Sequence, residues 1–166
     1  MSGGSIIVLA ILAFVGITIF KGVRIVPQGY KWIVQRLGKY HTTLAPGLNF
    51  VIPYVDEVAY KVTTKDIVLD IPSQEVITRD NAVLLMNAVA YINLTTPEKA
   101  VYGIENYTWA IQNLVQTSLR SIVGEMDLDD ALSSRDHIKA KLKAAISDDI
   151  SDWGITLKTV EIQDIK

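Results

Sequence analysis

The residue types that usually carry out chemistry are sparse in this chain. Its only two histidines, His41 and His137, lie nearly a hundred residues apart, and there is no cysteine. A general base, an activated nucleophile or a metal site needs several such groups together. The lack of cysteine also excludes disulfides and thiolate chemistry, and it fits a reducing compartment. We therefore expect both histidines to be ordinary surface or helix residues, and we predict no catalytic site, metal site or cofactor.

Three acids, Asp127, Asp129 and Asp130, form one dense group of carboxylates. A calcium loop of the EF-hand type would also need a central glycine and a distal glutamate, and this segment has neither. Acids at the start of a helix are favoured by the helix dipole. We therefore expect these residues to begin a helix rather than to bind a cation.

An uncharged run over residues 6–20 is followed at once by Lys21 and Arg24. At 1.5 Å per residue the run covers about 22 Å, against a hydrocarbon core of roughly 30 Å. Continuing it to Val26 gives about 20 residues, provided that Lys21 and Arg24 extend their charges to the headgroups. We predict a membrane anchor over residues 1–26, whose spanning residues include Ile6, Leu9, Ile11, Phe14, Ile17 and Phe20.

A secretory signal peptide and a buried core helix are the alternative interpretations of this run. A signal peptide needs a basic start and a small-residue cleavage site. Residues 1–5 carry no charged side chain, and Lys-Gly-Val-Arg follows the run. A helix that is apolar on every face is also unusual as a core helix at a chain end. The membrane anchor is therefore the preferred interpretation.

The charges around the anchor are asymmetric. Five Lys and Arg residues follow the uncharged run before residue 41, and the first acid is Asp56. The positive-inside rule then places the N-terminus outside and the domain in the cytoplasm, with a bacterial inner membrane as the expected location. From residue 41 onward eleven Lys and Arg stand against eighteen acids, which argues against nucleic acid as a partner.

The pattern beyond the anchor changes once along the chain. Residues 27–94 contain short alternating and β-branched runs separated by turns, which predict an antiparallel β subdomain. Among them are two short runs over residues 67–71 and 75–78 and a long apolar strand over residues 83–94. After Thr96, helical spacing predicts helices near residues 97–102, 106–124, 127–132 and 134–153, before a last strand over 155–162. Thr96, Asn106 and Ser134 are the expected N-caps, and Pro97 is expected at the first helical position. We therefore predict an α+β protein with an α/β second subdomain over residues 95–166.

The apolar segment over residues 48–55 has two interpretations. It is either a buried strand of the β subdomain or a segment that dips into the bilayer interface close to the anchor. In the second case Phe50, Ile52 and Tyr54 would make the contact, because aromatic side chains are favoured at the interface.

Six stretches of the sequence resemble the SPFH or Band 7 family, which includes stomatin, prohibitin, flotillin and HflK-HflC. They are VPQG at 26–29, RLGKY at 36–40, LAPGLNFVIP at 44–53, LDIPSQEVITRDN at 69–81, QTSLR at 116–120 and VEIQDI at 160–165. Their order matches that of the family, and the chain looks most like its stomatin-like, paraslipin or QmcA-type branch. Members of the family continue into a long helix that assembles the oligomer. The resemblance therefore implies that residues 1–166 alone are monomeric or weakly associated.

The resemblance implies a membrane scaffold without enzymatic activity, which forms ring-like or cage-like homo-oligomers and encloses microdomains of the bilayer. The alternative is an adaptor that regulates a membrane AAA protease of the FtsH type. A ring needs two complementary faces on each protomer. Candidate contacts are a cationic set, Arg135, Lys139 and Lys143, and an acidic set that includes Asp127 and Asp130. A membrane-anchored enzyme is the third interpretation, and no residues support it.

Overall fold

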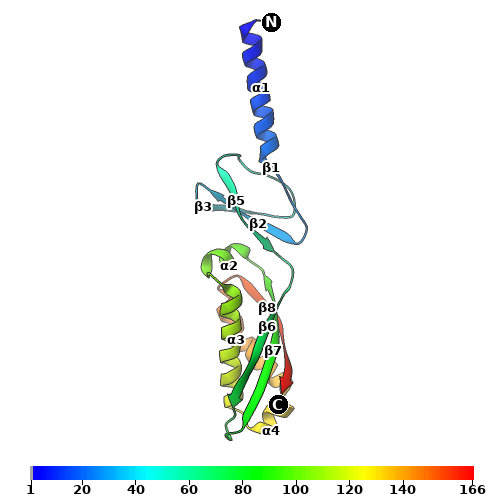
Figure 1. The fold of residues 1–166 in the computed structure, drawn as a ribbon, viewed down its shortest axis with the longest axis vertical. Helices are drawn as coiled ribbons and strands as arrows, with labels where there is room; N and C mark the ends of the chain where they lie inside the picture. The colour runs from blue at the N-terminus through cyan, green and yellow to red at the C-terminus, as the bar shows by residue number, and fades with distance from the viewer. Residues whose placement is uncertain (1) are drawn as a thin grey trace. The chain divides into compact units, whose positions relative to one another are not determined.

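The computed structural model describes residues 2–166 and shows the predicted α+β architecture (Figure 1). The chain forms two compact units, the first ending at Thr64 and the second beginning at Lys65. We describe each unit by itself.

The first unit begins with one long helix, α1 (Gly3–Gly22), and continues with short strands. These are β1 (Val23–Val26), β2 (Tyr30–Arg36), β3 (Lys39–Leu44), β4 (Gly47–Phe50) and β5 (Asp56–Thr63). β1 and β4 form an antiparallel ribbon, and β2 lies between β3 and β5 in an antiparallel sheet. Val26, Val34, Leu44 and Val51 form a small buried cluster, against which Trp32 and Val58 pack.

Helix α1 is displaced toward the N-terminus relative to the expected span. It begins at Gly3 and ends at Gly22, whereas the sequence suggested an apolar stretch that continues to Val26. Residues 23–26 instead form β1, because their backbone pairs with β4 and Val26 is buried in the cluster of the first unit. A helix of 20 residues is about 30 Å long and matches the hydrocarbon core without β1.

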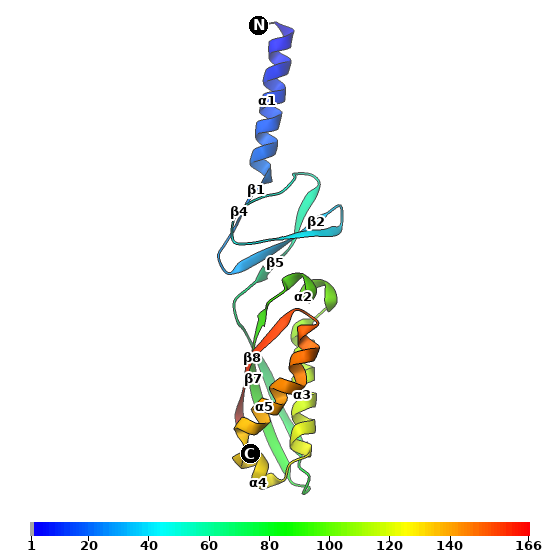
Figure 2. The ribbon, with the colours of Figure 1, turned by 180° about the vertical axis from the view of Figure 1, so that it is seen from behind.

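The second unit is a three-stranded antiparallel sheet with helices on one face. Its elements are β6 (Ile67–Ile77), β7 (Val83–Leu94), α2 (Pro97–Gly103), α3 (Tyr107–Gly124), α4 (Leu128–Ser133), α5 (Arg135–Ser151) and β8 (Ile155–Ile165). The strand order is β6-β7-β8. Figure 2 shows α3 and α5 together against this sheet. Alternate residues of β7 from Leu84 to Leu94 are buried beneath these helices, because successive side chains of a strand point to opposite faces of the sheet.

The division between the units falls between residues 64 and 65 rather than after residue 94. The reason is that β7 pairs along its length with β8, so that β6 and β7 belong to the unit that contains the helices. The two short runs expected over residues 67–71 and 75–78 are one strand, β6. A register shift between Ile71 and Gln74 accommodates Pro72 within it.

The predicted helix starts are partly supported by side-chain bonds. The Asn106 carboxamide oxygen accepts a hydrogen bond of 3.1 Å from the backbone N–H of Trp109, which confirms the predicted cap of α3. Pro97 is the first residue of α2, as expected. Thr96 and Ser134 precede α2 and α5, but their side chains form no capping bond.

Candidate membrane-contact site

α1 exposes apolar side chains on every face. Its mean hydropathy is 2.5 over an 18-residue window, and none of that window is buried against the rest of residues 2–166. All six predicted spanning residues are exposed: Ile6, Leu9, Ile11, Phe14, Ile17 and Phe20. So much apolar area is unfavourable in water and favourable in hydrocarbon. By length and composition, α1 is able to cross a membrane.

The end of α1 is joined tightly to the segment that follows β4. The backbone N–H of Val51 donates a hydrogen bond of 2.8 Å to the carbonyl oxygen of Gly22, the last residue of the helix. A Cβ atom at position 22 would lie 2.5 Å from the Val51 carbonyl oxygen and 2.9 Å from the Phe50 ring. Glycine is therefore required here, and residues 50 and 51 are held at the level where α1 ends.

The ribbon of β1 and β4 presents an apolar face next to this junction. Val23 pairs with Phe50 and Ile25 pairs with Leu48, so the four side chains share one face of the antiparallel ribbon. All four are exposed, and 59% of Phe50 is accessible. Val51, in contrast, is buried in the cluster of the first unit. The segment over residues 48–55 thus has both an exposed apolar side and a buried anchor point.

Tyr54 projects from a tight turn between β4 and β5. Its φ angle is +69°, a left-handed conformation that costs a bulky residue conformational energy, and 74% of its surface is exposed. The ammonium group of Lys21 lies 5.6 Å from the centre of its ring, within range of a cation–π contact. Ile52, at the start of the same turn, is also exposed.

Asp56 holds this turn in place. One carboxylate oxygen accepts a bond of 2.7 Å from Nε of Arg36, and the other accepts bonds from Nη2 of Arg36 and from the backbone N–H of Ile52. The Asp56 side chain is only 3% exposed. Hydrogen bonding by Arg36, assisted by the Ile52 N–H, outweighs desolvation and lowers the pKa of Asp56 to about 2.

The two predicted headgroup contacts, Lys21 and Arg24, lie at the end of α1 and in β1. Lys21 approaches Tyr54, whereas Arg24 is exposed and forms no ion pair or hydrogen bond through its side chain within residues 2–166. The structure therefore places Lys21, a predicted headgroup contact, beside Tyr54 of the predicted interfacial segment. Arg24 and Phe50 lie in the adjacent strands β1 and β4. The Gly22–Val51 bond that assembles them has no local sequence signal.

The residues predicted to make oligomer contacts lie in the second unit, and three of them have partners there. Asp127 pairs with Arg79, Lys139 with Glu161 at 2.5 Å, and the Lys143 ammonium donates to the carbonyl oxygen of Lys158 at 3.2 Å. Arg135 and Asp130 are exposed and form no ion pair within residues 2–166. Contacts of these residues with a second copy remain a prediction.

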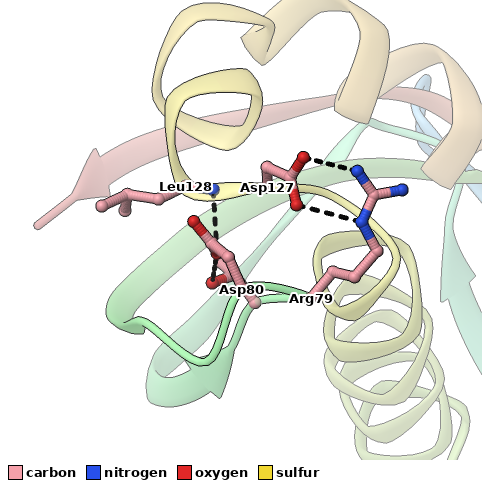
Figure 3. Close-up of polar contacts among 5 residues, drawn as sticks. Arg79, Asp80, Asp127 and Leu128 are labelled. Atoms are coloured by element: carbon pink, nitrogen blue, oxygen red, sulfur yellow. Dashed lines mark hydrogen bonds and ion pairs between the residues drawn. The ribbon is translucent and has the colours of Figure 1, made fainter.

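The acids at α4 take part in an arrangement that the sequence did not indicate (Figure 3). The Arg79 guanidinium forms two bonds with the Asp127 carboxylate, and the Asp80 carboxylate accepts a bond of 3.2 Å from the backbone N–H of Leu128. The hydroxyl of Thr78 also donates to Asp80, and this bond is the main cause of the lowered pKa of Asp80. The turn after β6 therefore caps α4, while Asp129 and Asp130 occupy its first turn as expected.

Potential catalytic groups are dispersed. His41 on β3 and His137 on α5 are both exposed and lie in different units. Within residues 2–166 no three His, Cys, Asp or Glu side chains are grouped so that they could hold a metal ion. The close contact at Gly22, the Lys21–Tyr54 pair and the left-handed Tyr54 lie together near the end of α1.

Residues 24–166 match the family model described as SPFH domain / Band 7 family. The chain belongs to the SPFH/Band 7 family. The match begins at Arg24, two residues after the end of α1, and includes most of β1, all of β4 and the Tyr54 turn of the candidate site. The predicted family is thereby confirmed.

Several relatives of this SPFH protein are similar over most of its length. An uncharacterised protein of Methanocaldococcus jannaschii is 40% identical over 96% of this chain and 78% of its own length. Human mitochondrial stomatin-like protein 2 is 39% identical over 84% of this chain, and an uncharacterised protein of Mycobacterium tuberculosis is 35% identical over 98%. The alignments span only 39% and 42% of those two relatives. The stomatin-like relatives and the apolar helix α1 together indicate membrane association.

Proposed function

We propose that this SPFH-domain protein is a membrane-anchored scaffold that assembles with copies of itself and organises a patch of bilayer. One observation carries the proposal: an exposed apolar helix of membrane-spanning length is fixed to the SPFH domain at Gly22, where exposed apolar side chains gather. A flexible tether would only concentrate the domain near a membrane. A fixed junction would also orient it, and orientation favours lateral assembly.

The same geometry supports an interfacial dip of the segment after β4. A span of 20 residues places Gly22 near the edge of the hydrocarbon core, and the Val51 bond holds Phe50 there. Phe50, Ile52 and Tyr54 then lie at the depth where aromatic and aliphatic side chains are favoured. The positive charge that follows α1 orients the domain toward the cytoplasm in this proposal. A reporter fused after Ile165 and active only on the external side would contradict that orientation.

Lateral assembly is tested by the mass of the full-length protein in detergent. A large, discrete homo-oligomer supports the scaffold, whereas a small species that copurifies with a membrane AAA protease favours the adaptor function. Replacing Arg135 with Glu should weaken assembly if this exposed cation faces an acid of the next protomer. An exposed pair contributes only about 0–1 kcal/mol, but the effect repeats at every interface of a ring. Restoration of the mass by a second change, Asp130→Arg, would identify the two residues as partners.

A further inference from the structure

The end of α1 borders an open cleft of about 770 Å³. The last turn of α1, β1, one side chain of β2, the segment after β4 and the first residue of β5 surround it. Its walls include Phe20, Lys21, Arg24, Trp32, Tyr54 and Asp56. Every one of these residues belongs to the first unit. A volume in this range is typical of sites that bind a small molecule or a substantial part of a lipid.

The charge in the cleft is positive. Asp56 is the one acid in its wall, and Arg36 neutralises it through two hydrogen bonds at 2.7 and 3.1 Å. Lys21 and Arg24 have no acidic partner within residues 2–166. The cleft therefore presents two uncompensated cations beside aromatic walls.

A second hollow of about 430 Å³ continues the cleft along β5. It shares Arg24, Trp32, Val51 and Asp56 with the first and adds Lys61 and Glu57. The Lys61 ammonium lies 4.4 Å from the centre of the Trp32 ring. The wall shared by the two hollows thus contains the Trp32 indole, which Lys61 covers on one side, and the Arg24 guanidinium. Such a surface suits a phosphate next to an apolar group.

The position of the cleft identifies its occupant. Phe20 is 83% exposed in the last turn of a helix of membrane-spanning length, so the cleft opens where acyl chains meet headgroups. Resting on the proposed membrane anchoring, we propose that the cleft binds one anionic phospholipid from the surrounding leaflet. Lys21 and Arg24 hold its phosphate, Trp32 packs against its glycerol region, and an acyl chain passes between Phe20 and Tyr54.

Trp32 offers a direct measurement of this binding. The chain has three tryptophans, and replacing Trp109 and Trp153 with Phe leaves Trp32 as the sole reporter. The full chain in this background is reconstituted into phosphatidylcholine vesicles that contain increasing amounts of brominated phosphatidylglycerol. We expect Trp32 fluorescence to be quenched with saturation at a low mole fraction. Brominated phosphatidylcholine at the same fraction should quench weakly. Equal quenching by the two lipids would overturn the proposal.

A matched pair of variants separates a built site from general attraction to a charged surface. Arg24→Gln should raise the half-saturating fraction of phosphatidylglycerol roughly fivefold. Lys39→Gln removes the same charge from β3, outside the cleft. This variant should leave the half-saturating fraction of phosphatidylglycerol unchanged. Equal shifts in both variants would overturn the site. If Arg24→Gln does not insert, Lys21→Gln serves as the second test with the same expected increase.

Two further controls assign the source of the phosphate and keep this proposal separate from the scaffold function. Excess inorganic phosphate should not relieve the quenching, and relief would assign the cleft to a soluble anion instead. Retention of the wild-type chain in membranes after alkaline extraction tests the anchor itself. A retained chain without preference for phosphatidylglycerol overturns the lipid site alone, whereas an extracted chain overturns the anchored scaffold.

Discussion

The backbone N–H of Val51 donates a 2.8 Å hydrogen bond to the carbonyl oxygen of Gly22. This bond satisfies one of the carbonyl groups that a helix leaves free at its C-terminus. It also fixes the exposed Phe50 and the turn that carries Tyr54 beside the end of α1. The side of the SPFH domain next to α1 is therefore built by a contact between residues far apart in the sequence.

Replacing Gly22 with Ala should destabilise the first unit. The added Cβ would lie 2.5 Å from the Val51 carbonyl oxygen, and a backbone atom cannot move aside as a flexible side chain can. We expect a loss of about 1–3 kcal/mol in the free energy of unfolding, as for other forced contacts in packed sites. Unfolding in detergent micelles followed by near-ultraviolet circular dichroism measures it. Gly16→Ala in the same helix is the control, because its Cβ meets nothing within 4 Å.

The absence of cysteine makes the interfacial dip directly testable. A single cysteine in place of Phe50 should react slowly with a membrane-impermeant maleimide in vesicles, because lipid would cover this exposed position. In the absence of lipid it should react rapidly. A cysteine in place of Gln28 is the control. Gln28 is exposed beyond the end of β1 that lies away from α1, and it should react rapidly in vesicles. Rapid reaction at both positions in vesicles would show that the segment stays in water.

Changing Tyr54 to Asn should separate folding from membrane contact. Asn tolerates the left-handed φ of +69° better than an aromatic residue, so the variant should be as stable as the wild type or up to about 1 kcal/mol more stable. It loses the exposed ring that we place at the interface. Thermal unfolding and the fluorescence of Trp32 in brominated vesicles report the two effects. Reduced stability would show that the ring packs within the fold instead.

Local patterns in the sequence predicted much of the fold. The long apolar run over residues 83–94, which forms β7, and the asparagine cap of α3 are local signals, and both are confirmed. β1 was interpreted as part of the span because Val23, Ile25 and Val26 are as apolar as the helix before them. Only the pairing with β4 turns these residues into a strand, and pairing is not visible in a single segment.

The sequence pointed to individual residues of the candidate site but not to the contacts that hold them together. Lys21, Arg24, Phe50 and Tyr54 stood out by residue type and by their distance from the anchor. The bond between Gly22 and Val51 and the support of the turn by Asp56 depend on backbone geometry across the whole unit. The same holds for Asp80, which caps α4 from a turn between two strands. The sequence rules consider only the residues next to a helix, and so they pointed to the helix-start acids Asp127, Asp129 and Asp130 and gave Asp80 no role.

Asp56→Asn should lower the stability of the first unit by about 2 kcal/mol at neutral pH, because charge-assisted bonds to Arg36 are lost in a buried position. The pKa of Asp56 in the folded chain is about 2, below its ordinary value of 3.8. Its contribution is therefore complete above about pH 4 and is lost as the pH falls toward 2. Unfolding measured at several pH values should show the wild type approaching the variant over this range.

A control for general acid effects removes a different carboxylate. Asp149→Asn changes the net charge by the same amount at an exposed position of α5 that has no ion-pair partner within residues 2–166. The difference in unfolding free energy between Asp149→Asn and the wild type should not change with pH in the way expected for Asp56→Asn. Parallel profiles for the two variants would mean that overall charge, and not the Arg36 pair, sets the pH dependence.

The two halves of the arrangement at α4 should differ in importance. Arg79 and Asp127 are 64% and 41% exposed, and an exposed ion pair contributes little to stability because water and salt screen it. Asp80 instead accepts bonds from the Thr78 hydroxyl and from the first backbone N–H of α4, so its loss leaves a helix end uncapped. We therefore expect Asp80→Ala to lower the midpoint of thermal unfolding of the second unit more than Arg79→Ala does. Added salt should reduce the effect of Arg79→Ala further and leave most of the effect of Asp80→Ala. The opposite order would mean that the ion pair, and not the cap, holds the turn after β6 against α4.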